Sequence, residues 1–300
     1  MSRRLQGYLL LSLAMMTVGT TVIASKLLAG AVPPFLATAA RFALALPVLL
    51  LLLARSPVPW PRLGWRDRGL LVLQAAAGSV GYTVLLVSGL EHLPAADAGV
   101  IVGTLPAVSA LFSVMVLKER PGLRLLASAL LATVGVMAVA WQAPGQSSWV
   151  GVLYVLGAVF CESAFILLNK RMAQPLGALQ QATAMVALGL LVPLPVALFE
   201  LPVAMPSTVA LAALAWYALV PTVGGFLLWY AGAARVSGSE AATLTAVAPL
   251  TAVALAAALL GDEVGLAQWL GAGAVVLAIL ILALPARLSG ARWRLGRAGG

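Results

Sequence analysis

The feature that most constrains this chain is a succession of long apolar stretches with almost no charge. The stretches lack the alternation of apolar and polar residues that marks a membrane β-strand. Helices and closed barrels satisfy their backbone polar groups in hydrocarbon, and about twenty helical residues cross a bilayer core. Composition agrees, because 62% of residues are hydrophobic and 9% are charged, whereas soluble domains are about 25% charged. The chain is therefore predicted to be an all-α integral membrane protein.

Charges, proline and glycine clusters and hydropathy divide the chain into ten predicted spans. Their connections are short, so no separate soluble domain is expected. The first span is too long for the apolar region of a typical signal peptide and is expected to remain in the mature protein. The predicted transmembrane helices cover residues 8–30, 34–54, 69–89, 95–117, 122–142, 150–170, 176–199, 208–232, 238–260 and 265–286.

Basic residues are distributed unevenly among the connections. With the N-terminus in the cytoplasm, 16 of the 18 Lys and Arg residues fall in cytoplasmic segments, and Lys26 and Arg41 lie inside spans. This asymmetry follows the positive-inside rule and predicts a multi-pass protein of the bacterial inner membrane with both termini cytoplasmic. The net charge of +9 is thus a topology signal, and no nucleic-acid partner is expected. The external loops contain acidic charges instead, namely Glu91, Glu200, Asp262 and Glu263.

A shift of 143 residues aligns the chain partly with itself, and Pro106 then falls on Pro249. Because each half holds five spans, an odd number, the second half must enter the membrane in the opposite sense. The sequence therefore predicts two inverted five-helix repeats, residues 1–145 and residues 146–300, the second ending in a short basic tail. Inverted repeats are typical of transporters that open alternately to the two sides of the membrane around a site near its midplane.

Several motifs together form a recognisable pattern along nearly the whole chain. They are Lys26, Arg41, residues 89–95 leading to Pro106, residues 117–120, and the repeated stretches 241–249 and 260–263. This pattern resembles the drug/metabolite transporter superfamily, in its ten-helix, EamA-type subfamily of two duplicated five-helix units. The resemblance implies an inner-membrane exporter of amino acids or other metabolites. Within the subfamily, the chain is similar to bacterial exporters of aromatic and other neutral amino acids.

Glu162 is the strongest single candidate for a functional residue. It lies well inside span six, where an unpaired carboxylate costs roughly 2.5–3.5 kcal/mol, so it is expected to face protein or a wet cavity. It is expected either to bind a substrate ammonium or a coupling proton, or to make a structural hydrogen bond to Asn169 or another helix. Lys26 is near enough to the outer end to snorkel. Arg41 is deeper and is expected to pair with a carboxylate or with helix C-terminal carbonyls.

We expect a central cavity between the halves, formed by spans one, three, four, six, eight and nine. Small residues on spans three and eight indicate either close helix packing or a cavity wall, and threonine hydroxyls commonly bond to their own helix. Pro106 and Pro249 remove backbone donors near mid-span and act either as static kinks or as hinges. The predicted substrate-binding lining comprises Glu162, Tyr82, Ser79, Gln74, Thr20, Trp216, Tyr217 and Asn169.

Several classes of function lack their sequence signatures. No Walker A motif, HExxH or GxSxG is present. One cysteine and one histidine cannot supply a haem or iron–sulfur ligand set, so neither a cofactor nor a metal site is expected.

Three functions fit a chain of this kind. The inverted repeat favours a secondary transporter for a small molecule in the lipid bilayer, as a monomer or homodimer, with no catalytic residue. A lipid or lipid-linked sugar flippase shares this fold type and is distinguished by a lateral opening to lipid. An intramembrane enzyme acting on a lipid needs a second carboxylate or histidine at the depth of Glu162, and the sequence contains none.

Overall fold

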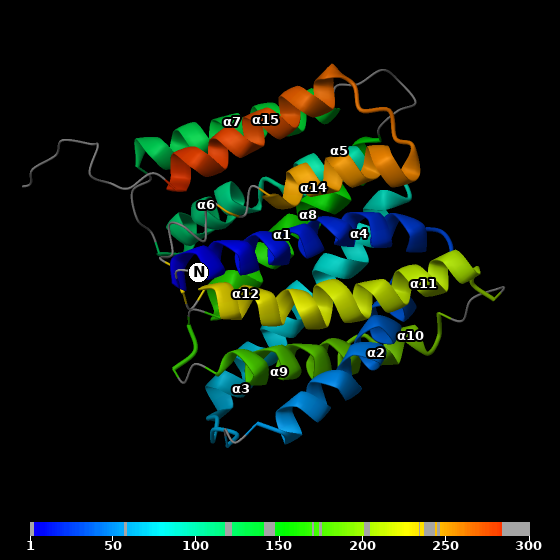
Figure 1. The fold of residues 1–300 in the computed structure, drawn as a ribbon, viewed down its shortest axis with the longest axis vertical. Coiled ribbons are helices and arrows are strands. Elements are labelled where there is room, and N and C mark those ends of the chain that lie inside the picture. Colours follow the sequence, from blue (N-terminus) through cyan, green and yellow to red (C-terminus); the bar gives the residue numbers. More distant parts are fainter. Residues whose placement is uncertain are drawn as a thin grey trace, which may run out of the picture.

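The computed structural model is a bundle of helices that run side by side, with the chain passing back and forth between the two ends of the bundle (Figure 1). It contains no strand within the described residues. Those residues are 3–56, 59–117, 122–140, 148–169, 171–173, 176–200, 205–233, 235–236, 244 and 247–283. The predicted basic tail, the start of span nine and the side chains of Pro106 and Asn169 lie outside the described parts.

The helices of the first half follow the apolar stretches closely. The helix α2 begins directly after Pro33, whose fixed φ suits a helix start. The elements α3, η1 and α4 together form one long apolar helix, Trp65–Leu90, that is interrupted by the π-helical stretch η1. The elements are α1 (Arg3–Leu28), α2 (Pro34–Ala54), α3 (Trp65–Gln74), η1 (Ala75–Gly81), α4 (Tyr82–Leu90), α5 (Ala95–Val102), α6 (Leu105–Leu117) and α7 (Leu123–Ala140).

The second half repeats this sequence of elements. A π-helical stretch again interrupts one long helix, and it begins 143 residues after the first one, at Ala218 compared with Ala75. The elements are α8 (Trp149–Asn169), α9 (Ala178–Leu191), α10 (Leu194–Ala197), α11 (Thr208–Tyr217), η2 (Ala218–Gly225), α12 (Phe226–Ala233), α14 (Val247–Leu255), η3 (Ala256–Leu260) and α15 (Leu266–Ala283).

Length and composition identify the helices that can cross a membrane. Six in the described ranges are long and apolar enough, and four shorter apolar helices overlap the remaining predicted spans. The membrane-protein prediction is thereby confirmed, whereas the number ten stays a prediction. The six are Arg3–Leu28, Pro34–Ala54, Trp65–Leu90, Trp149–Leu168, Ala178–Ala197 and Thr208–Gly232, and the four are Ala95–Ser109, Leu125–Gly135, Val247–Leu260 and Leu266–Ile281.

Large apolar side chains cover the outside of the bundle. Leu130 on α7 and Leu153 on α8, for example, are both 66% exposed. Water would penalise so large an apolar exterior, because soluble monomers rarely expose contiguous apolar patches above a few hundred Å². Hydrocarbon imposes no such penalty, so the lipid-facing surface follows directly from the composition.

Helices of the first half pack mainly against helices of the second half. α7 lies with α15 at one edge of the bundle, and α2 lies with α9 at the opposite edge (Figure 1). Between these edges, α4 packs on α8, α5 packs on α14, and α1 packs on both α12 and α14. The interior of the protein is therefore the contact between its two halves.

Glycines make two of these helix contacts unusually close. A Cβ atom at Gly78 would lie 2.7 Å from the Cβ of Phe165 on α8, and one at Gly89 would meet that helix equally closely. In the second half, a Cβ at Gly232 would lie 2.7 Å from the Cγ of Leu11 on α1. Of the two interpretations left open by the sequence, close packing therefore describes these three glycines.

The proline regions of the fourth and ninth predicted spans lie at one helix crossing. The helix breaks between α5 and α6, at Gly103 and Thr104, just before Pro106. A Cβ at Gly103 would be only 2.7 Å from the Cβ of Pro249, which is buried on α14. The helix break next to Pro106 is an observed feature, and its use as a hinge remains a prediction.

The close contact of Gly78 in η1 with α8 predicts a specific sensitivity to added volume. Gly78→Ala is expected to destabilise the protein by about 1–3 kcal/mol, the usual cost of overpacking. Gly273→Ala on α15 is the matched control, because no atom lies within 4 Å of its added Cβ. Thermal unfolding in detergent should show a lower midpoint for Gly78→Ala alone, and equal midpoints would contradict the packing.

Candidate functional site

Four side chains from both halves of the protein interact electrostatically between the packed helices. Arg41 comes from α2 and Tyr82 from the start of α4, whereas Glu162 comes from α8 and Tyr217 from the end of α11. We call this set the central cluster. Three of its members were predicted cavity residues, and the fourth, Arg41, was singled out only as a buried charge. Tertiary packing therefore brings together residues that are up to 176 positions apart.

Arg41 is held between two aromatic rings. Its side chain is buried, and its Cζ lies 4.1 Å from the ring centroid of Phe42 and 4.3 Å from that of Tyr217. Such cation–π contacts partly replace the hydration that a buried guanidinium loses. Arg41 interacts electrostatically with the carboxylate of Glu162, but no direct ion pair or hydrogen bond to a helix carbonyl is found among the described residues. The Arg41 Nε atom has no hydrogen-bond partner there, so it remains able to donate to a ligand.

Tyr217 is placed by an irregularity in its helix. Pro221, four residues further on, has no N–H to donate to the Tyr217 carbonyl, as a regular helix would require. The hydroxyl of Thr222 donates to that carbonyl instead, at 2.8 Å, inside the π-helical segment η2. The Tyr217 ring is almost fully buried, and its hydroxyl has no hydrogen-bond partner among the described residues. A second polar group of the central cluster is thus available to a ligand.

Glu162 lies on α8, opposite Arg41 and Tyr82. It interacts electrostatically with both, yet no hydrogen bond or ion pair to its carboxylate is found among the described residues. The next residue, Ser163, accepts a hydrogen bond from the hydroxyl of Ser109 at 3.0 Å and so ties α8 to α6. A carboxylate and a guanidinium therefore share one interior region without direct contact.

Gln74 and Ser79 connect α3 and η1 to α9. The amide of Gln181 donates to Gln74 Oε1 at 2.9 Å, and the Ser79 hydroxyl donates to the carbonyl of Met185 at 3.4 Å. All of these groups are buried. The hydrogen bonds of Gln74 and Ser79 therefore serve the packing of α9, and a cavity-lining role for these two residues remains a prediction.

Thr20 and Trp216 form a separate pair between α1 and α11. The indole N–H of Trp216 donates to the Thr20 hydroxyl at 3.0 Å, and that hydroxyl donates in turn to the Thr17 carbonyl at 2.6 Å. The Trp216 ring is 49% exposed. Consecutive helical residues point about 100° apart, which explains why Tyr217 reaches the central cluster while its neighbour faces outward.

Lys26 is half-buried and reaches the predicted outer end of the bundle, where its ammonium caps a helix. Its ammonium donates to the carbonyls of Leu90 at 2.7 Å and Leu93 at 3.0 Å, at the C-terminus of α4. The last carbonyls of a helix have no intrahelical partner and carry partial negative charge. A cation at this position therefore satisfies the last carbonyl of α4, together with the Leu93 carbonyl in the turn that follows, and joins α1 to α4.

Two carboxylates of the second half cap helices of the first half at the same end of the bundle. Glu200 Oε2 accepts hydrogen bonds from the backbone N–H groups of Phe35 at 2.9 Å and Leu36 at 3.1 Å, at the start of α2. Asp262 Oδ2 accepts from the N–H of Ala96 at 3.1 Å, at the start of α5. Charged acceptors at helix N-termini are stabilising. These bonds hold the two halves together at this end.

Two prolines in the sequence are a signal for these caps. Prolines 33 and 94 occupy the N-cap positions of α2 and α5, and neither makes a side-chain cap. The first N–H groups of both helices therefore needed an acceptor from elsewhere in the chain. Gly261, with φ of 69°, ends η3 in a left-handed turn that leads directly into Asp262.

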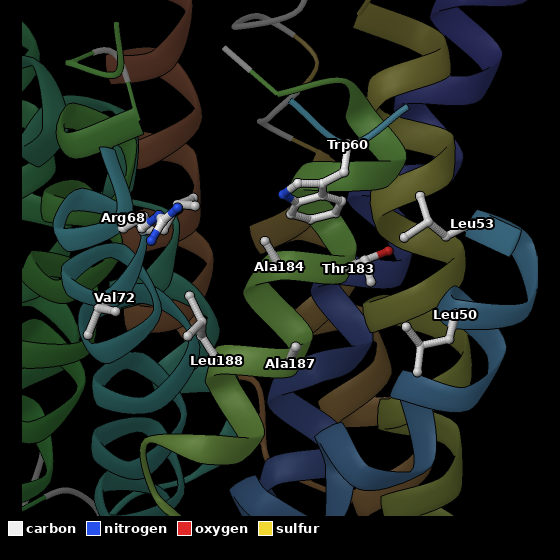
Figure 2. Close-up of a pocket in the computed structure, with 10 residues that line it drawn as sticks. Leu50, Leu53, Trp60, Arg68, Val72, Thr183, Ala184, Ala187 and Leu188 are labelled. Carbon is white, nitrogen blue, oxygen red and sulfur yellow. The ribbon is translucent and has the colours of Figure 1, made fainter. Parts of the chain in front are cut away.

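A groove of about 410 Å³ opens between α2, α3 and α9, away from the central cluster. Figure 2 shows residues of α9 between Leu50 and Leu53 of α2 on one side and Arg68 and Val72 of α3 on the other. Almost all of the lining is apolar. In the described residues no group of three or more His, Cys, Asp or Glu side chains is placed to hold a metal ion.

Comparison with known proteins gives a consistent result for both halves. The model of the EamA-like transporter family matches residues 5–141 and again residues 149–284. Among similar proteins of Bacillus subtilis strain 168, the uncharacterized transporter YetK is 29% identical over 287 residues, 93% of this chain and 87% of YetK. The uncharacterized transporter YwfM is 30% identical over 226 residues, covering 72% of this chain and 74% of YwfM.

A solved structure is also similar. This crystal structure of a protein shares 24% sequence identity with the chain and has a TM-score of 0.67. The match covers 96% of this chain and 100% of the other. At this level of identity the likeness establishes a shared fold and nothing about function.

The caps between the halves predict a position-specific loss of stability. Asp262→Ala removes the acceptor for the Ala96 N–H and is expected to cost about 0.5–2 kcal/mol, the usual cost of losing an N-cap. Glu263→Ala is the control, because the neighbouring side chain is exposed and caps no helix among the described residues. If both variants unfold at the same temperature in detergent, the cap contributes nothing.

Proposed function

This chain belongs to the EamA-like transporter family, and we propose that it exports amino acids, mainly aromatic and other neutral ones. It is a multi-pass membrane transporter for a small molecule and not an enzyme. The proposed mechanism is alternating access to a central cavity that contains the central cluster.

The observation that carries the proposal is a pair of opposite charges that share the interior without neutralising each other. Arg41 offers an unpartnered Nε, and Glu162 has no hydrogen bond or ion pair among the described residues. An amino acid zwitterion carries a carboxylate that matches Arg41 and an ammonium group that matches Glu162. Burying both charges of the substrate is costly unless each finds a partner, and the central cluster supplies both.

The aromatic side chains of the central cluster support the choice of neutral and aromatic amino acids. Tyr82 interacts electrostatically with both Arg41 and Glu162, and the rings of Phe42 and Tyr217 lie against Arg41. Aromatic rings add attraction in offset or edge-to-face contact with a second ring. A third charge on the substrate would have no counterpart among these residues.

Two inverted repeats, residues 1–145 and 146–300, provide the proposed movement. The duplication is supported by the double family match, by the equal spacing of η1 and η2, and by helix pairs that each combine one helix from each half. In the proposed topology both termini are cytoplasmic in a bacterial inner membrane. Opening toward the external side then requires the hydrogen bonds of Glu200 and Asp262 to break.

A lipid flippase is the second function considered at the sequence level, and the groove between α2, α3 and α9 bears on it. A flippase must conduct a polar headgroup through the membrane, where unpaired polar groups are expensive. The groove lining is apolar apart from Arg68, Thr183 and the Trp60 indole, and it contains no member of the central cluster. The groove lining therefore offers a headgroup few hydrogen-bonding or charged side chains on its way to the interior. An amino acid exporter fits the structure better than a flippase.

The role proposed for Arg41 is tested by transport of labelled phenylalanine into proteoliposomes. Arg41→Gln is expected to raise KM about tenfold or more, because a hydrogen bond to a charged group contributes about 1.5–3 kcal/mol. Arg171→Gln, an exposed arginine, is the control. Phenylalaninamide, which lacks the carboxylate, should compete poorly with phenylalanine in the unmodified protein. That preference should disappear in Arg41→Gln, and its persistence would contradict carboxylate binding by Arg41.

Glu162→Gln tests the other charge. The carboxamide can neither attract the substrate ammonium nor exchange a proton, so uptake should fall and its pH dependence should flatten. Glu263→Gln provides the exposed control. Unchanged flux and an unchanged pH profile for Glu162→Gln would assign that carboxylate a structural role.

A further inference from the structure

The apolar groove between α2, α3 and α9 has a shape that follows from its sequence. Ala184 and Ala187 on α9 are too small to fill the space between the flanking helices. Leu50 and Leu53 on α2 form one wall, and Val72 on α3 forms part of the other (Figure 2). The result is an apolar cleft of about 410 Å³ that opens on the side of the bundle.

The groove lies near one end of the bundle, beside residues typical of a membrane interface. Its lining comes from the last turns of α2, which ends at Ala54, and from the first turns of α3, which begins at Trp65. On α9 the lining residues lie between five and ten positions after the helix start, which corresponds to about 8–15 Å at 1.5 Å per residue. Trp60 and Trp65 lie at the same end, and tryptophan is typical of the membrane interface.

A cationic mouth adjoins this apolar cleft. Arg68 lines the groove, is exposed, and donates from Nε to the Leu63 carbonyl at 3.1 Å, with its Cζ 5.1 Å from the Trp65 ring centroid. Its two terminal guanidinium nitrogens have no hydrogen-bond partner among the described residues. The same connection carries three more exposed arginines, at positions 55, 62 and 66.

The acidic residue beside these arginines, in the first turn of α3, points into the protein. Asp67 is buried, with 4% of its side chain exposed, and its Oδ1 accepts a hydrogen bond from the Ala173 N–H at 3.1 Å. Among the described residues around the groove entrance, the exposed charges are the arginines, next to a space lined by alkyl side chains.

We propose that this groove binds one anionic phospholipid from the leaflet at the N-terminal side of the bundle. An acyl chain fills the space over Ala184 and Ala187, and the phosphate accepts hydrogen bonds from Arg68. Basic groups beside clefts between transmembrane helices recognise anionic headgroups in this way. The lipid bridges α2 and α3 of the first half to α9 of the second. The site is independent of the central cluster and of the substrate proposed for it.

The test compares lipids of equal chain length on the purified full-length protein in detergent. Native mass spectrometry should retain phosphatidylglycerol about fivefold more than phosphatidylcholine, and phosphatidylglycerol should raise the thermal midpoint more. Arg68→Gln should abolish this preference, because one arginine near the surface accounts for about a fivefold effect. Arg171→Gln, an exposed arginine that does not line the groove, should keep the preference.

A second variant tests the contribution of the apolar cleft to lipid binding separately from that of the Arg68 charge. Ala187→Phe fills the cleft and keeps Arg68, so it should reduce retention of phosphatidylglycerol while phosphate binding at the mouth is unaffected. Glycerol 3-phosphate is the probe for the headgroup alone and should give no comparable stabilisation. Equal retention of both lipids, equal behaviour of the two arginine variants, or full stabilisation by glycerol 3-phosphate would each overturn the proposal.

Discussion

Hydrocarbon offers no hydrogen bonds, and this constraint governs the whole structure. Every backbone or side-chain polar group at membrane depth needs a partner within the protein. Lys26 finds two carbonyls at the end of α4, and the carboxylates of Glu200 and Asp262 find backbone N–H groups. Where Pro221 withholds a donor, the hydroxyl of Thr222 replaces it. Five buried side-chain atoms in the described residues lack a hydrogen-bond partner, and two of them, Arg41 Nε and the Tyr217 hydroxyl, belong to the central cluster, where the proposed substrate would bind.

Close packing is the second requirement for a stable helix bundle in a membrane, because lipid tails compete with side chains for apolar contact. Glycine lets α4 approach α8, and another glycine lets α12 approach α1, at distances that a methyl group would prevent. Both contacts join opposite halves of the chain. A rocking movement must therefore separate surfaces that are tightly fitted, and the bonds made by Glu200 and Asp262 are concentrated at one end, where such separation begins.

The proposed transport site and the proposed lipid site differ in their chemistry. The central cluster contains two opposite charges and two tyrosine rings, and the ring of Phe42 lies against its arginine. The groove beside α9 contains alkyl side chains with a positive charge at its mouth. An amphipathic zwitterion suits the first, and a negatively charged lipid suits the second. Each region thus selects its ligand by the number and sign of the charges that it leaves uncompensated.

Sequence alone determined that this is a membrane protein of apolar helices, because length and hydropathy are local properties. It also predicted Glu162, Tyr82 and Tyr217 as cavity residues, since polar groups inside apolar stretches are visible without a fold, and their role in binding stays a prediction. Periodicity placed Gln74 on a helix face, but only packing revealed that this face meets Gln181 on α9.

Tertiary structure alone decided the partners. The Glu200 and Asp262 caps join residues 164 to 166 positions apart, and the ring of Tyr217 stacks on Arg41 from the other half of the chain. A helical pattern reports which residues share a face, whereas the neighbour of that face depends on how distant helices pack, and no local sequence property contains that information.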